Sequence, residues 1–157
     1  MFRNSKTGRS MTDDFKQMAK DLNKMLNEVT LEAESKLEEI WSDSFESERY
    51  KGGKSSKWKG RKKPDKGDGS ARKERRGLLV KEGDLIGSAD TFHKGREAGI
   101  RTDVPYAQVH NEGLKAGRGK GFTMPERQFM PKPGEESKVV TKHLDKVIEE
   151  KMDKIMR

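Results

Sequence analysis

The sequence has no cysteine and little apolar material, and these two shortages set the first limits on what the chain can be. Without cysteine there is no disulfide framework, no thiolate metal ligand and no thiol nucleophile. Only 29% of the 157 residues are hydrophobic, 39% are charged, and the mean hydropathy is -1.11, so the core must be small. Such a chain is expected to rely on partner subunits or to carry long solvated segments.

Long hydrophobic runs are also missing. No stretch approaches the roughly 18 apolar residues that a membrane-spanning helix needs. The first residues, MFRNSKTGRSM, lack the apolar segment of a secretory signal. We therefore expect a soluble intracellular protein with no membrane partner.

The positive charge is concentrated in one segment. Residues 49–76 hold 13 Lys or Arg against three acidic residues, a net charge of +10, while the whole chain has +8. Gly, Ser, Lys and Pro replace any apolar periodicity there, which predicts a basic mobile arm at about 50–76. Its charge could be solubilising, or it could contact phosphate backbones, with Trp58 stacking on a base or packing into the core. The candidate nucleic-acid or partner contacts are Lys57, Trp58, Lys59, Arg61, Lys62 and Lys63.

A long amphipathic helix is predicted at the N-terminal end. Ser10 followed by Asp13 resembles a capping box, and apolar residues then recur at spacings of three and four from Phe15 to Trp41. Carried to about Phe45, this helix would be roughly 50 Å long at 1.5 Å per residue. One small domain cannot cover an apolar stripe of that length.

The rest of the chain predicts a small sheet and a second long helix. The stretch at residues 77–104 should form a small antiparallel sheet with a hairpin turn at HKGRE, followed by a flexible loop at KAGRGKGF and an edge strand over Arg127 to Met130. A C-terminal amphipathic helix should carry Glu135 and Glu136 in its first turn. The predicted class is α+β: a long N-terminal helix, a small antiparallel sheet with a short capped helix, and a C-terminal amphipathic helix. The apolar residues that mark this last helix are Val140, Leu144, Val147, Ile148 and Ile155.

The stretch VPYAQVHNEG contains His110 and at first suggests catalysis. His110 and Glu112 have the H-x-E spacing of zinc deaminases, but the cysteine ligands of that site are missing. No serine elbow, lysine motif, Walker spacing or helical histidine pair accompanies it. We therefore expect no metal, no cofactor, no small-molecule substrate and no enzymatic activity.

A structural interpretation of the same stretch is simpler. Asp103 can cap a short helix, Pro105 suits its first turn, and Gly113 suits the left-handed residue that ends it. Tyr106, Val109 and His110 would then share a face and pack on the sheet. The imidazole would hydrogen bond a nearby backbone group or carboxylate.

VPYAQVHNEG followed by MPERQFM resembles the P-Y-A-x-x-H-x-x-G and P-x-R-x-F motifs of the phage virion morphogenesis family, the tail-completion proteins. LLVKEGDLIGS is similar to that family's segment after a basic region, so the resemblance covers about residues 78–131. It implies that the residues that fix the fold or a subunit contact are Pro105, Tyr106, Ala107, His110, Gly113, Pro125, Arg127 and Phe129.

The resemblance also implies a function. Residues 1–157 would form a single tail-completion-like domain, a non-enzymatic virion component at the head-to-tail junction or tail end. It would act as a ring of identical subunits that contacts other neck or tail proteins, in the host cytoplasm during assembly and then in the virion. The basic arm could face packaged DNA. The alternative is a free nucleic-acid-binding protein that uses residues 49–76 as its binding arm.

Overall fold

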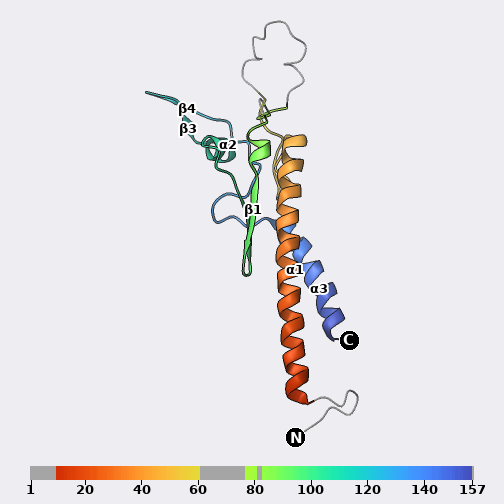
Figure 1. Cartoon of the computed structure of the whole chain (residues 1–157). Helices are drawn as coiled ribbons and strands as arrows, with labels where there is room; N and C mark the ends of the chain where they lie inside the picture. The colour runs from red at the N-terminus through yellow and green to blue at the C-terminus, as the bar shows by residue number, and fades with distance from the viewer. Residues whose placement is uncertain (1–9, 61–76, 81–82, 157) are drawn as a thin grey trace.

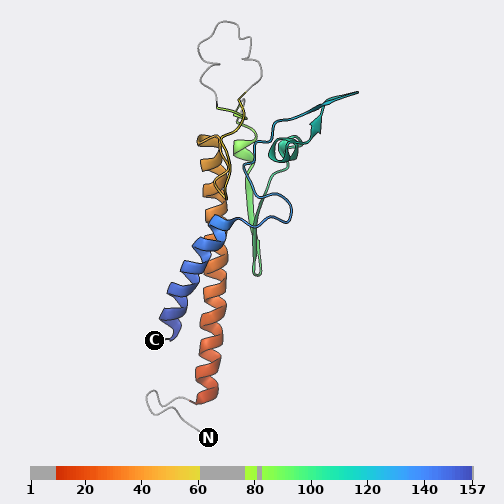
Figure 2. The same cartoon turned by 180° about the vertical axis from the view of Figure 1, so that it is seen from behind.

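The computed structural model describes residues 10–60, 77–80 and 83–156, and it has the predicted α+β class. Helix α1 runs the length of the molecule, with helix α3 along one side and the β1–β2 hairpin along another (Figures 1 and 2). Helix α2 and the β3–β4 hairpin lie near the C-terminal end of α1 (Figure 1). The elements in chain order are α1 Met11–Glu46, the 3-10 turn η1 Ile86–Ser88, β1 Asp90–Lys94, β2 Glu97–Arg101, α2 Ala107–Glu112, β3 Lys115–Ala116, β4 Phe122–Thr123 and α3 Lys138–Met156.

Helix α1 begins where the sequence predicts and extends past the rest of the fold. The Ser10 side chain accepts a hydrogen bond from the Thr12 amide at 3.3 Å, which caps the helix. The 36 residues span about 54 Å at 1.5 Å per residue. Its buried side chains begin at Met25, whereas Phe15 is 64% exposed. The other elements therefore cover only the C-terminal two thirds of the helix, and the first turns of its apolar stripe are bare.

The middle of α1 packs against the hairpin and α3. Strands β1 and β2 pair antiparallel around the turn at Gly95, which has a φ of +63°, as the HKGRE signal predicts. Ala98 and Ile100 of β2 pack against a core of residues from α1, α3 and the segment after α1. Burial, together with the nearby Glu135 carboxylate, raises the pKa of Tyr50 to about 12, so this core phenol is neutral. The buried residues of this core are Ala33, Leu37, Ile40, Tyr50 and Val140.

The C-terminal end of α1 carries a second core, built around four aromatic rings that we call the aromatic node: Trp41, Phe45, Trp58 and Phe129. Trp41 meets Phe129 edge-on with ring centroids 5.0 Å apart, and Phe45 meets Trp58 edge-on at 5.7 Å. These are favourable geometries for aromatic pairs. The node joins three segments that are far apart in the sequence.

The prediction of a mobile arm from residue 50 is wrong for residues 50–60. Tyr50 is 2% exposed and Trp58 is 7% exposed, because both rings fill core positions beside α1. Their apolar area offsets the cost of ordering a Gly- and Lys-rich backbone. The rest of the predicted arm, residues 61–76, lies outside the described residues.

Three further predictions of local structure are corrected. Residues 127–130 form no strand, because side chains and helix α2 take up their polar backbone groups in place of a neighbouring strand. The expected flexible loop KAGRGKGF forms the β3–β4 hairpin. Helix α3 begins at Lys138, so Glu135 and Glu136 precede it, and Glu135 instead accepts a hydrogen bond from the Lys132 amide at 3.0 Å.

Within the described ranges, no helix combines the length and apolar character needed to cross a bilayer.

Gly52 joins the segment after α1 to α3 and leaves no room for a side chain. Its carbonyl accepts a hydrogen bond from the Ser137 hydroxyl at 2.9 Å. A Cβ atom at Gly52 would overlap the Tyr50 hydroxyl, whereas one at Gly53 would lie 3.6 Å from the Tyr50 ring, an ordinary contact.

We predict that Gly52→Ala destabilises the protein by about 1 to 3 kcal/mol, the usual cost of overpacking a core. Gly53→Ala is the matched control and should change the free energy of unfolding by less than about 0.5 kcal/mol. Denaturant unfolding of the three proteins measures both. Equal stability of the two variants would contradict the packing described here.

Candidate functional site

The two ends of helix α2 are formed by residues of the first motif. Gly113 ends the helix with a φ of 69°, the left-handed conformation that the sequence predicts. A Cβ there would lie 3.0 to 3.1 Å from three atoms of Glu126, so glycine also lets the two segments approach closely. Ala107 is 2% exposed and packs on the aromatic node. The predicted cap at Asp103 is not formed: Tyr106 occupies the N-cap position without a side-chain cap.

Arg127 acts as a clamp between two distant segments. Its Nε and Nη2 atoms both donate hydrogen bonds to the Lys59 carbonyl, each at 3.1 Å, and the residue is 7% exposed. The Trp58 Nε1 donates to the Gln128 carbonyl at 2.8 Å, next to this clamp. The segment before residue 60 and the MPERQFM motif are therefore held together by side-chain donors as well as by ring packing.

Asn111 is the residue that sequence reasoning missed. Its Oδ1 accepts hydrogen bonds from the backbone amides of Phe129, at 2.9 Å, and Met130, at 3.1 Å. The side chain is fully buried. The only signal in the sequence is its place inside the motif, because an asparagine beside His110 and Glu112 resembles a polar surface residue until the partner backbone is known.

His110 contacts the Tyr106 ring, and its environment disfavours a charge. Burial, and then the Arg127 guanidinium, lower the pKa of His110 below its ordinary value of 6.5. The Tyr106 ring stands edge-on at 6.0 Å between centroids, while the His110 carbonyl accepts from the Arg127 amide at 2.8 Å. The expected imidazole hydrogen bond is not found at Nδ1, which has no partner among the described residues.

The two motifs form one structural joint, which we call the motif joint: α2 with Gly113, the segment 125–130, and the Lys59 carbonyl. It brings Ala107, His110, Arg127 and Phe129 together, whereas Tyr106 is 45% exposed and Pro105 faces solvent. In the parts of the chain that the structure describes, no group of three His, Asp or Glu side chains is placed to hold a metal ion. The contacts of this joint hold the two motifs and the segment before residue 60 together.

The candidate partner contacts do not all lie on a surface. Of the two alternatives for Trp58, the structure has the core one, so its ring is not available for stacking on a base. Lys57 and Lys59 on either side are exposed. Arg61, Lys62 and Lys63 lie outside the described residues.

We predict that Asn111→Ala destabilises the protein by about 1 to 3 kcal/mol, because two buried amides lose their acceptor. Gln108→Ala, on the exposed side of the same helix, is the control and should be nearly silent. Thermal unfolding measures both. A silent Asn111→Ala would show that the motif joint does not depend on these bonds.

We predict that His110 makes stability fall as the pH is lowered. Well above pH 6.5 the imidazole is neutral in both the folded and the unfolded state, so it contributes no pH dependence there. Below that value the unfolded chain takes up a proton that the folded chain resists, so the folded state loses stability. Wild type should lose stability relative to His110→Gln between about pH 7 and about pH 5 in denaturant unfolding. The other two histidines are present in both proteins, and parallel pH curves would contradict the prediction.

The comparison with known proteins covers both motifs of the joint. The chain matches the phage virion morphogenesis family over residues 7–155. It is also 39% identical over 52 residues to the Mu-like prophage FluMu G protein 2 of Haemophilus influenzae, a match that covers 33% of this chain and 38% of that protein. No solved structure matches the chain. Because the family match spans nearly the whole sequence and includes both motifs of the joint, the chain belongs to the phage virion morphogenesis family.

Proposed function

We propose that this protein is a structural component of the phage head-to-tail junction or tail end, where it completes the tail as a ring of identical subunits. The observation that carries the proposal is the bare apolar stripe on the N-terminal turns of α1, in a chain of this family. Family membership supports a role in virion assembly. The stripe supports a subunit whose burial is completed by neighbours.

The stripe is placed to contact a neighbour. Met11, Phe15 and Met18 are 51%, 64% and 41% exposed and recur at helical spacing on the side that is buried further along α1. Helix α3 does not reach these turns in either view (Figures 1 and 2). A continuous apolar surface of this kind on a charged chain is typical of an interface with another copy or another neck or tail protein.

The proposed role is not enzymatic. The motif residues support one another: Arg127 binds a backbone carbonyl, Asn111 binds two backbone amides, and Phe129 fills the aromatic node. A catalytic reading of His110 would need a nucleophile or a second proton-transfer group beside it. The imidazole stands edge-on to the Tyr106 ring and is repelled, when charged, by the Arg127 guanidinium, and neither contact is the hydrogen bond of an activated nucleophile.

A second candidate is contact with packaged DNA through the basic segment. The exposed Lys57 and Lys59 favour it, because both lie on the surface on either side of the buried Trp58. Phosphate contacts release counterions, so such binding should weaken steeply as salt rises. DNA binding that is insensitive to salt, or unchanged in Lys57→Glu with Lys59→Glu, would count against it.

We predict that Phe15→Asp and Met18→Asp leave the isolated chain folded and block its incorporation into particles. An exposed position tolerates a carboxylate in the monomer, but burial of that charge in an interface is costly. Cells infected with phage that encode each variant in place of the wild-type protein should contain unjoined heads and tails in electron micrographs. Circular dichroism of the purified variants measures the fold.

Two substitutions in the same helix are the controls. Leu31→Asp, at a 52% exposed position on the opposite side of α1, should fold and assemble normally. Leu37→Asp, at a 7% exposed core position, should unfold the chain. Normal particle yield from both Phe15→Asp and Met18→Asp would contradict the assembly role of the stripe.

A further inference from the structure

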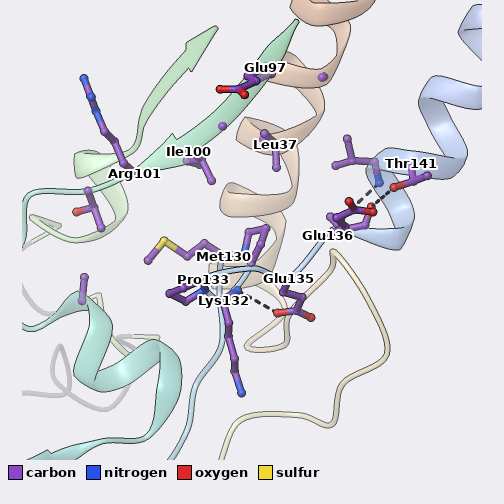
Figure 3. Close-up of a pocket in the computed structure, with 18 of the residues that line it drawn as sticks. Leu37, Glu97, Ile100, Arg101, Met130, Lys132, Pro133, Glu135, Glu136 and Thr141 are labelled. Carbon is purple, nitrogen blue, oxygen red and sulfur yellow. Dashed lines mark hydrogen bonds between the residues drawn. The ribbon is translucent and has the colours of Figure 1, made fainter. Parts of the chain in front are cut away.

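A large groove lies between α1, β2, α3 and the segment 130–137, apart from the bare stripe. Its volume is about 900 Å³. Leu37 and Ile100 form part of its floor, and Met130 lies across from them (Figure 3). The groove is thus open at the surface but apolar at its base, which is the form of a site that takes up an apolar side chain.

The rim of this groove is acidic. Its lining holds five acids against three cations: Arg96, which is exposed, Arg101, which is paired with Asp90 at 2.6 Å, and Lys132, which is paired with Glu126 at 3.0 Å. Glu97 and Glu136 are exposed and stand on two sides of the groove (Figure 3). The acids of the lining, none of which has an ion pair among the described residues, are Glu97, Asp103, Glu112, Glu135 and Glu136.

The β3–β4 hairpin has the complementary character. Residues 114–123 hold three cations and no acid: Lys115, Arg118 and Lys120 are all exposed. Phe122 is 59% exposed and Leu114 is 39% exposed, so the hairpin also presents apolar side chains. It projects away from the body of the molecule (Figures 1 and 2). No residue of 114–123 lines the groove of its own chain.

We propose that the β3–β4 hairpin of one copy docks in the groove of the next copy. Phe122 would enter the apolar base, and the hairpin cations would meet Glu97 and Glu136 on the rim. The two surfaces are different parts of one chain, so the contact is heterologous, and a heterologous contact closes into a ring when its rotation permits. The proposal rests on the ring proposed above and assigns its subunit contact.

Charge reversal tests the pairing in purified protein. The hairpin variant carries Arg118→Glu with Lys120→Glu, and the groove variant carries Glu97→Lys with Glu136→Lys. Each alone should weaken self-association at least about tenfold, because close interfacial charges become repulsive. Controls of equal charge change on exposed α3 positions, Lys142→Glu with Lys146→Glu and Glu149→Lys with Glu150→Lys, should associate like wild type.

Mixing the two variants tests the head-to-tail geometry. The hairpin variant keeps a native groove and the groove variant keeps a native hairpin, so the mixture should form a one-to-one complex that grows no further. One chain that carries all four changes should associate again, because the charges of the hairpin and of the groove are then both reversed and attract each other. A mixture that stays monomeric, with no recovery in the fourfold variant, overturns the proposal.

Disulfide trapping tests the same contact inside particles, since the chain has no cysteine of its own. Thr123→Cys and Glu97→Cys chains, produced together, should give a covalent mixed dimer on mild oxidation, both in particles and in concentrated purified protein. Thr123→Cys with Ser42→Cys, an exposed position on α1, is the control and should give none. Absence of the mixed dimer from both samples overturns the docking.

Two outcomes distinguish the proposed docking from the proposed function and from DNA binding by the hairpin. Particles that lack the protein, together with a mixed dimer in purified protein, contradict the proposed function and leave the docking intact. Loss of DNA binding in the hairpin variant, with unchanged association in both variants, overturns the docking and assigns the hairpin to nucleic acid.

Discussion

The packing of four aromatic rings at the C-terminal end of α1 is the contact on which the rest of the structure depends. Trp41 and Phe45 come from the helix, Trp58 from the segment after it and Phe129 from the second motif. Each indole nitrogen is satisfied by a distant carbonyl: Trp41 donates to Ile86 at 2.9 Å and Trp58 donates to Gln128 at 2.8 Å. Ring packing and the Trp58 bond therefore hold the segment after α1 to the second motif, and the Trp41 bond adds η1 to the same core.

The aromatic node and the motif joint explain why the two motifs come as a pair. Residues 126–130 have no strand partner, so α2 must supply their hydrogen bonds through Asn111 and the His110 carbonyl. Gly113 lets the segment approach the end of that helix. A change in either motif thus leaves polar groups of the other without a partner, which makes the pair one structural unit of this chain.

Signals that act over a few residues were readable in the sequence, and those that act over long separations were not. The Ser10 cap, the stripe of α1, the turn at Gly95 and the left-handed Gly113 depend on near neighbours, and all four are present in the structure. The burial of Trp58 depends on a carbonyl 70 residues away. The role of Asn111 depends on amides 18 and 19 residues away, and no local pattern encodes either partner. Composition alone therefore made residues 50–60 look like a free arm.

The two ends of α1 differ in how they are packed, and this contrast supports the proposed function. One end is anchored in the aromatic node, while the other presents apolar side chains that no described residue covers. Hydrogen exchange of the isolated chain tests this account most directly. The amides of Trp58, Phe129 and Met130 should open with the same free energy as those of α1 near Trp41, and the amides from Phe15 to Leu22 should open far more easily. Fast exchange at Phe129 and Met130 would make the second motif a loosely held flap and contradict the account.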